Sequence, residues 1–150
     1  MKNKKYRRAI FAVTYSKNSK GKIEYLILKR KLHWKGWEFP KGKIEKFELK
    51  RRTAKREVFE ETGLKPVKIK RLGMSGKYDY EKKLKDRPGI VGQTFDLFMV
   101  EVKKGKIFMD KKEHSGYEWV DFKGAIKKIT WPNQKLCMKI VNEILEKNKR

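Results

Sequence analysis

The amino-acid sequence predicts an α/β or α+β layer fold, in which helices cover a β-sheet. Several short segments rich in apolar, β-branched and aromatic residues are separated by turn-forming residues, and these segments predict strands. Two further segments predict helices. One is the charged stretch at residues 48–62, and the other follows Pro132 near the end of the chain.

In the first half of the chain, residues 9–15 and 23–28 predict a hairpin, because the segment between them contains Asn, Ser and Gly. Residues 31–36 predict a loop, which leads to an extended approach ending at Pro40. Gly42 then breaks the chain before the helix expected over residues 48–62. Good helix formers fill that segment, and Gly63 is typical of a helix C-terminus.

In the second half, residues 67–72, 93–102 and 117–122 predict strands. The polar region that ends at Gly89 predicts a flexible loop in its later part, and Gly105 marks a turn. Apolar residues recur at helical spacing after Pro132, so one face of a final helix should pack on the sheet. These residues are Leu136, Ile140, Val141, Ile144 and Leu145.

The length of 150 residues predicts one domain, over residues 1–150. Aromatic residues make up 12%, which argues against disorder although 40% of residues are charged. Because no apolar run approaches the roughly 18 residues of a membrane span, we expect a cytoplasmic protein without a membrane partner or an obligate protein partner. Cys137 is the only cysteine, which excludes an internal disulfide and predicts a buried core thiol.

The formal net charge of +24 is the strongest anomaly of the composition. A positive field of this size attracts polyphosphates or nucleic acid. The lysines are, however, spread along the chain, and lysine enrichment is also typical of proteins adapted to high temperature. The charge therefore predicts either a solvated surface or a surface that faces nucleic acid.

One sequence pattern predicts a catalytic site. Residues 42–64 read G-x5-E-x7-R-E-U-x-E-E-x-G-U, where U is a bulky aliphatic residue. Glu57, Glu60 and Glu61 stand at i, i+3 and i+4, so they project from one helix face. Such carboxylates raise one another's pKa values unless a hard cation occupies the cluster, and all-oxygen ligation favours Mg²⁺ or Mn²⁺. A lone E-x-x-E-E would more often be a salt-bridged surface helix, but here the whole pattern is present.

This pattern resembles the signature of the Nudix hydrolase family at every specified position. The resemblance implies the Nudix fold, a mixed β-sheet sandwiched between helices (α/β/α), with a catalytic loop–helix–loop at residues 42–64. It also implies metal-dependent hydrolysis of phosphoanhydride bonds. Glu57, Glu60 and Glu61 would hold Mg²⁺, for which Mn²⁺ could substitute, together with the carbonyl group of Lys41.

The same resemblance assigns structural roles to four other residues of the pattern. Gly42 would supply a tight turn, and Gly63 would end the helix. Glu48 and Arg56, two helical turns apart, would brace the loop against the helix.

Segments outside the signature resemble those shared by dinucleoside tetraphosphate hydrolases and RNA 5′-pyrophosphohydrolases. They are W-E-F-P-K-G at residues 37–42, Gly92-Gln93 before an aromatic strand, and E-H-S-G-Y-E-W-V at residues 113–120. The resemblance implies that Glu113 is a further metal ligand or a base. We expect His114 to be an incidental loop histidine rather than a phosphate or base contact, and Trp119 to pack in the core beneath Glu113.

Substrate phosphates require cations, and Arg30, Lys41 and Lys43 flank the start of the signature, where a polyphosphate would approach the metal. Tyr78 and Tyr80 could stack on a nucleobase, and the alternative is that they only anchor their loop.

The first expectation for the reaction is asymmetric hydrolysis of a dinucleoside tetraphosphate, diadenosine tetraphosphate (Ap4A), to ATP and AMP. The alternative substrates are triphosphorylated RNA 5′ ends, nucleoside triphosphates and ADP-ribose, among which the signature acids do not discriminate. The high positive charge favours RNA. A different class of function is a basic RNA-binding module on a catalytically idle Nudix scaffold.

Overall fold

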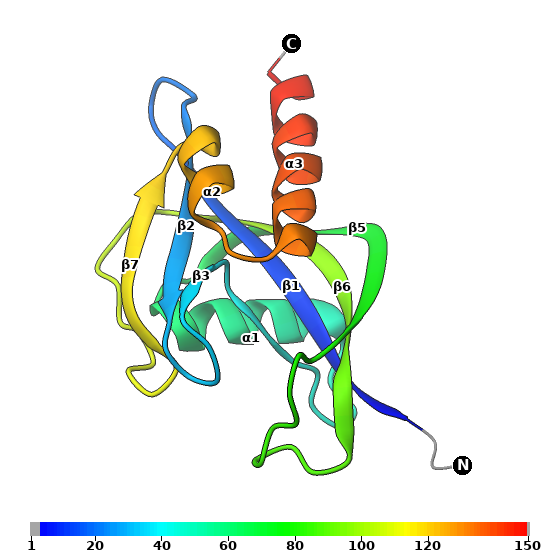
Figure 1. Cartoon of the computed structure of the whole chain (residues 1–150). Helices are drawn as coiled ribbons and strands as arrows, with labels where there is room; N and C mark the ends of the chain where they lie inside the picture. Colours follow the sequence, from blue (N-terminus) through cyan, green and yellow to red (C-terminus); the bar gives the residue numbers. More distant parts are fainter. Residues whose placement is uncertain (1–3, 150) are drawn as a thin grey trace.

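The structure is a computed structural model that describes residues 4–149. A seven-stranded sheet forms its centre, in the order β3-β2-β1-β6-β5, with β4 paired to β1 and β7 paired to β2 (Figure 1). The strands are β1 (Lys5–Lys17), β2 (Ile23–Arg30), β3 (Gly36–Glu38), β4 (Lys41–Lys43), β5 (Pro66–Asp79), β6 (Ile90–Val102) and β7 (His114–Val120). The helices are α1 (Lys50–Thr62), α2 (Phe122–Lys128) and α3 (Pro132–Lys147). β1 and β6 run parallel and the other paired strands run antiparallel, so the sheet is mixed, as expected.

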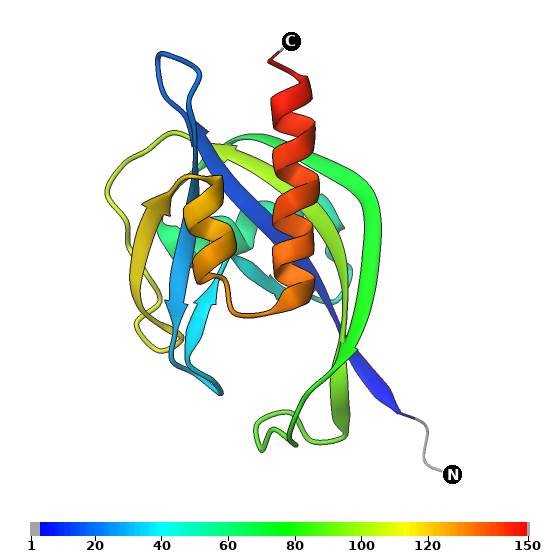
Figure 2. The same ribbon diagram turned by 45° about the horizontal axis from the view of Figure 1, so that its top comes forward.

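The sheet is covered on both faces, because the buried residues of β1 alternate between two core clusters. Ile10 and Ala12 pack toward Ala54 and Val58 of α1. Phe11 and Val13 belong to the cluster that includes residues of α2 and α3. Figure 2 shows α2 and α3 on one side of the sheet and α1 on the other, which confirms the α/β/α expectation.

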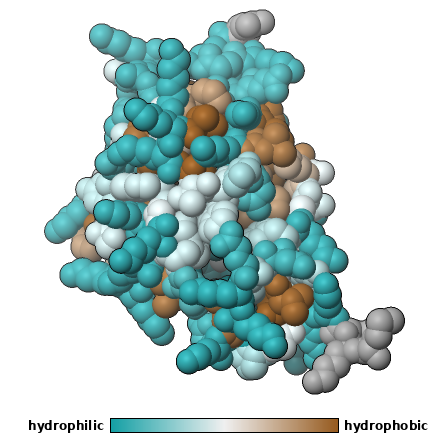
Figure 3. All heavy atoms as spheres, in the orientation of Figure 1, coloured by the Kyte–Doolittle hydropathy of each residue, from teal (hydrophilic) through white to brown (hydrophobic). Residues whose placement is uncertain are grey.

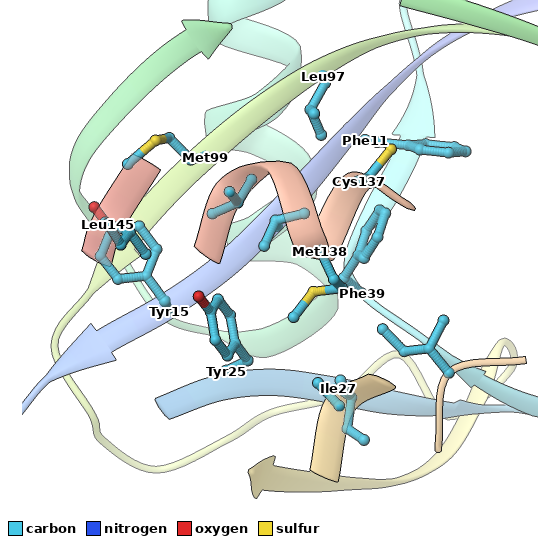
Figure 4. Close-up of a cluster of buried hydrophobic side chains, with 14 of the residues drawn as sticks. Phe11, Tyr15, Tyr25, Ile27, Phe39, Leu97, Met99, Cys137, Met138 and Leu145 are labelled. Atoms are coloured by element: carbon cyan, nitrogen blue, oxygen red, sulfur yellow. The ribbon is translucent and has the colours of Figure 1, made fainter. Parts of the chain in front are cut away.

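The larger cluster holds α3 against the sheet (Figure 4). Phe11 and Phe95 stack with their ring centroids 4.0 Å apart, and Met138 of α3 is fully buried. Burial of each such side chain stabilises the fold by about 1.5–3 kcal/mol. Cys137 is buried as predicted, whereas the prediction for Leu136 was wrong, since 51% of it is exposed.

The structure differs from the predicted elements at the end of β7. The expected strand at residues 117–122 begins earlier, at His114, and ends at Val120. Asp121 then accepts a hydrogen bond from the Gly124 amide (2.8 Å) and caps α2, a helix that the sequence did not predict. A helix of seven residues that includes Gly124 carries too little periodicity to be recognised.

Other boundaries also differ: β1, β2 and β6 are longer than predicted, and β5 and α1 differ as follows. β5 continues from the predicted strand to Asp79 because β6 pairs with it beyond a register shift, so the loop begins only at Tyr80. Helix α1 begins at Lys50 rather than residue 48, since Glu48 lies in the preceding turn. No helix in the described part of the chain is long and apolar enough to cross a membrane.

Candidate active site

The acidic face of α1 is graded from buried to exposed. Glu61 is only 3% exposed and accepts a hydrogen bond from the Lys41 amide at its Oε2 (3.3 Å). The Glu57 side chain is 12% exposed, whereas that of Glu60 is 55% exposed. The helix therefore directs Glu61 and Glu57 inward and leaves Glu60 at the rim.

Arg56 connects this face to the preceding loop. Its Nε and Nη2 donate to the two carboxylate oxygens of Glu48 (2.8 and 2.9 Å), and Nη2 also donates to the Lys43 carbonyl (2.8 Å). Its Nη1 donates to Glu57 Oε1 (2.7 Å) and Glu60 Oε2 (3.1 Å). This Arg56 hydrogen bond holds the pKa of Glu48 at about 2, so one guanidinium fixes the loop and orients two acids.

The structure explains why two positions of the signature are glycine. A Cβ atom on Gly42 in β4 would overlap the carboxyl group of Glu57. Gly63 has a φ of +76° and donates its amide to the Phe59 carbonyl (2.7 Å), which ends α1 in the left-handed conformation that glycine favours.

The buried acids are poorly solvated when no cation is near them. Burial raises the pKa of Glu57 to about 7, against the opposing effect of Arg56. Burial, followed by the charges of Glu38, Glu57 and Glu113, raises the pKa of Glu61 well above its ordinary value. Three residues, Glu61, Glu113 and His114, each offer one possible metal-ligating atom, and these three atoms lie within 4.8 Å of one another. Oxygen-rich groups that cannot all be ionised unaided fit a hard divalent cation.

A second set of side chains comes together where β3, β2 and β7 lie side by side. Arg30 ends β2, Glu38 ends β3, and His114 begins β7 opposite Arg30. Glu38 is fully buried, and its Oε2 accepts hydrogen bonds from His114 Nε2 (2.8 Å) and Arg30 Nη1 (3.2 Å). Lys41 Nζ lies 3.6 Å from its other oxygen. We call Glu38, Arg30, Lys41 and His114 the Glu38 cluster.

Sequence reasoning missed most of this cluster. The expectation that His114 is an incidental loop residue was wrong: it lies in a strand, is 1% exposed and bonds to Glu38. Glu38 had been assigned no role. The only available signal was that a glutamate and a histidine both fell within segments shared with relatives. Trp119 is half-buried against the core on the α1 side, with Lys104 Nζ 5.1 Å from its ring centroid, so it packs only partly as expected.

Arg30 and Glu113 are linked to each other. Arg30 is 4% exposed, donates from Nε to the Leu32 carbonyl (2.8 Å), and lies 3.6 Å from Glu113 Oε2 through Nη1. The Glu113 backbone carbonyl accepts a hydrogen bond from the Lys31 amide (2.9 Å). Arg30, which was predicted to contact phosphate, is thus held between Glu38 and Glu113 at the edge of the acidic cluster.

A pocket of about 490 Å³ opens beside these groups. Arg30 and Lys41 of the Glu38 cluster line the pocket, and Trp34, Tyr78, Tyr80 and Trp131 supply aromatic walls. Figure 3 shows the same side of the molecule, where polar side chains surround a paler hollow. Gln134, at the start of α3, lines the pocket and is 2% exposed, and its Oε1 has no hydrogen-bond partner among residues 4–149.

The remaining predicted substrate contacts are placed differently from one another. The Lys43 side chain is exposed. Tyr78 packs beside Phe11 and accepts a hydrogen bond from Gln93 Nε2 (2.9 Å), while Tyr80 accepts one from Arg87 Nη1 (2.7 Å). Both tyrosines are therefore anchored and also line the pocket, and stacking on a base stays a prediction for both.

Comparisons with known proteins agree with this geometry. The model of the NUDIX domain family matches residues 5–139. An RNA pyrophosphohydrolase of a Nitratiruptor species is 31% identical over 146 residues, which cover 94% of each chain. An RNA pyrophosphohydrolase from Pasteurella multocida is 28% identical, and the alignment covers 84% of this chain and 68% of the relative. The solved structure of a C. elegans Ap4A hydrolase superposes with a TM-score of 0.75 at 20% identity, covering 93% of this chain and 98% of that one.

Proposed function

Because the chain belongs to the Nudix family of phosphoanhydride hydrolases, we propose that it removes pyrophosphate from the triphosphorylated 5′ end of RNA. The observation that carries this proposal is the direct junction between the acidic cluster and the aromatic pocket. Arg30 and Lys41 belong to both, so a polyphosphate at the acids would continue into a nucleoside in the pocket. A volume of about 490 Å³ is in the range of small-molecule sites.

The choice of RNA over other nucleotides has separate support. The curated relatives that align with this chain over 77–94% of its length carry the name RNA pyrophosphohydrolase. A net charge of +24 far exceeds what one nucleotide requires, whereas a long polyanion gains from it throughout its length. The charge thus favours a nucleic-acid-facing surface over the alternative of thermal adaptation alone.

We propose Mg²⁺ as the cofactor, with Mn²⁺ as a substitute. Glu57, Glu60, Glu61 and the Lys41 carbonyl would hold it, with Glu113 as a further ligand or base. When bound, the ion would polarise phosphate oxygens and acidify a water molecule.

The chain's own residues have distinct proposed tasks around the reacting phosphates. Arg56 orients Glu57 and Glu60 through its Nη1. Arg30 orients Glu113, so that a Glu113 oxygen can accept a proton from the attacking water. Lys41 and Lys43 contribute positive charge for the leaving pyrophosphate. In the pocket, Tyr80 and Trp131 would stack on the base. Gln134 Oε1, which has no hydrogen-bond partner within residues 4–149, would accept a hydrogen bond from the amino group of the base.

Hydrolysis of Ap4A, the first expectation from the sequence, becomes the second candidate. The W-x-F-P and E-x-x-G-Y-x-W segments are compatible with it, since Ap4A hydrolases and RNA 5′-pyrophosphohydrolases share them, and they supply Glu38, Lys41 and Glu113 to the site. The catalytically idle scaffold gains no support, since every acid of the signature is present and the matched relatives bear the names of enzymes.

A substrate panel tests the proposal. With Mg²⁺ present, kcat/KM would be measured for 5′-triphosphate RNA, Ap4A, ATP and ADP-ribose, with products separated by chromatography. We expect triphosphate RNA to have the highest kcat/KM, by about tenfold or more, and to yield pyrophosphate and 5′-monophosphate RNA. A higher value for Ap4A, with ATP and AMP as products, would refute the RNA assignment in favour of the second candidate.

Replacement of Gly42 by alanine tests whether the position of Glu57 matters. The added methyl group would overlap the Glu57 carboxyl group, so this acid must move. We expect kcat/KM to fall by about 10²-fold, as for other misplacements near 1 Å. The matched control is Gly116→Ala in β7, where the new Cβ would meet only Lys29 at 3.9 Å. Equal activities of the two variants would remove Glu57 from the reaction.

A further inference from the structure

A groove of about 830 Å³ runs along α1. It shares Glu48 and Arg56 with the proposed active site, but its lining includes none of the acids that would hold the metal. Arg52, Lys55 and Phe59 stand at i, i+3 and i+7 and share one helix face. Phe59 is two residues from Glu57 and one from Glu60, and helix residues at these separations point in different directions. The face that carries Phe59 is therefore turned away from the acids. We call it the α1 groove and define it by Phe47, Leu49, Arg52, Lys55, Phe59 and Lys65.

The groove displays large apolar side chains to solvent. Phe47 is 95% exposed, Leu49 71% and Phe59 49%. The turn that carries Phe47 is well fixed: the Glu48 amide donates to the Glu45 carbonyl (3.0 Å), and the Glu45 amide donates to Glu48 Oε1 (3.1 Å). An aromatic ring is thus held in the open by the same glutamate that binds Arg56.

Phe47 also has an unfavourable backbone conformation. Its φ of 64° lies in the left-handed region, which bulky residues seldom adopt. Neither burial nor backbone preference explains a phenylalanine here, and strain of this kind is a reason to look for a function.

Cations surround the apolar residues. Arg52, Lys55 and Lys65 are exposed, and none of them forms an ion pair with another residue between positions 4 and 149. The groove's other charged residues, Glu48 and Arg56, neutralise each other. Three positive charges are therefore free to contact a ligand.

We propose that the α1 groove binds single-stranded RNA through its bases and phosphates, independently of the active site. Aromatic rings that accept stacked bases, set among cations, are the usual means of binding single strands without sequence preference. A second copy of this chain is a poor occupant, because two molecules of charge +24 repel each other. Since the acids are not involved, the ligand needs no triphosphate, and the proposal does not depend on the one made for the reaction.

Fluorescence anisotropy with a labelled 5′-hydroxyl RNA of about 12 nucleotides, in EDTA, tests this surface without hydrolysis. The double variant Phe47→Gly/Phe59→Ala should bind about tenfold or more weakly, given the usual contribution of stacked bases. Glycine adopts positive φ freely, so strain at residue 47 should not lower the melting temperature of the double variant. The control is Leu136→Ala, which removes an exposed apolar side chain from α3. Unchanged RNA affinity in the double variant would overturn the proposal.

A variant that removes the three positive charges of the α1 groove provides a second test. The triple variant Arg52→Gln/Lys55→Gln/Lys65→Gln should lower the slope of log Kd against log salt concentration by about 2. Lys20→Gln/Lys123→Gln/Lys139→Gln lowers the net charge equally at exposed positions elsewhere and should change the slope much less. Equal slopes in both triple variants would overturn the proposal, as would Phe47-dependent binding of a polyglutamate peptide without binding of RNA.

Discussion

Replacement of Glu61 by glutamine is expected to lower kcat by at least about 10²-fold, because a proposed metal ligand is lost while the shape of the side chain is kept. Glu61 is the most buried acid of α1, and its carboxylate lies beside those of Glu113 and Glu57. The amide keeps an oxygen acceptor for the Lys41 amide, so the local backbone should not change. Steady-state hydrolysis of the best substrate, at saturating Mg²⁺, measures the effect.

The same substitution should stabilise the protein when no metal is present. In the folded protein the pKa of Glu61 is raised above its ordinary value. At a pH above the ordinary pKa, the unfolded state releases the proton of this carboxyl group, whereas the folded state must either keep the proton or accept an unfavourable buried charge. Glutamine avoids both. In EDTA near pH 8, the melting temperature of Glu61→Gln should therefore exceed that of the unmodified protein.

Added Mg²⁺ should reverse this order. Ligand binding to the folded state alone raises the melting temperature of the unmodified protein, and the variant should gain little. Glu60→Gln is the matched control, since Glu60 is 55% exposed: it should lose activity without the gain in metal-free stability. Full activity of Glu61→Gln, or an equal shift by Mg²⁺ in both proteins, would show that Glu61 holds no metal.

The sequence could predict α1 and its acids because their geometry is local. The i, i+3 and i+4 spacing places Glu57, Glu60 and Glu61 on one face in any helix. The pair of Glu48 and Arg56 has a different origin, because Glu48 reaches Arg56 from the turn before α1, and only the resemblance to the family signature predicted it. What the spacing could not reveal was the burial gradient from Glu61 to Glu60, which depends on how α1 packs on the sheet.

The Glu38 cluster could not be predicted because its geometry is not local. Glu38 and His114 are 76 positions apart in the sequence, and they meet only because β2 pairs with β3 on one side and β7 on the other. A shift of one residue in either register would turn one of these side chains to the opposite face. The pocket has the same origin, since the loop at Trp34, the end of β5 and the start of α3 assemble it from distant parts of the chain.

Replacement of Glu38 by glutamine is expected to destabilise the protein by about 3–5 kcal/mol, because it leaves buried cations without their counter-charge. Arg30 is 4% exposed, and the Lys41 side chain is 11% exposed. Glutamine is nearly isosteric with glutamate, so the loss would report on charge rather than on a cavity. For a chain of this length the melting temperature should fall by roughly 10 °C, which differential scanning calorimetry would measure.

The pH dependence identifies the cause of this loss. Burial alone would raise the pKa of Glu38, but Lys41, the hydrogen bond from His114 and the charge of Arg30 together hold it at about 2, below the ordinary 4.5. An acid with a lowered pKa stabilises the fold above its unfolded-state pKa, and this contribution disappears as the pH falls through the folded-state value. The difference in unfolding free energy between the unmodified protein and Glu38→Gln should thus be full above pH 4.5 and shrink toward pH 2.

A surface ion pair provides the matched control for Glu38. Glu118 pairs with Lys128, but both side chains are about 40% exposed, so water and salt screen the pair. Glu118→Gln should therefore change the unfolding free energy by less than about 1 kcal/mol. If Glu38→Gln lost no more than Glu118→Gln, the Glu38 cluster would be dispensable for stability. If it lost stability equally at pH 2 and pH 7, the loss would come from packing and not from charge.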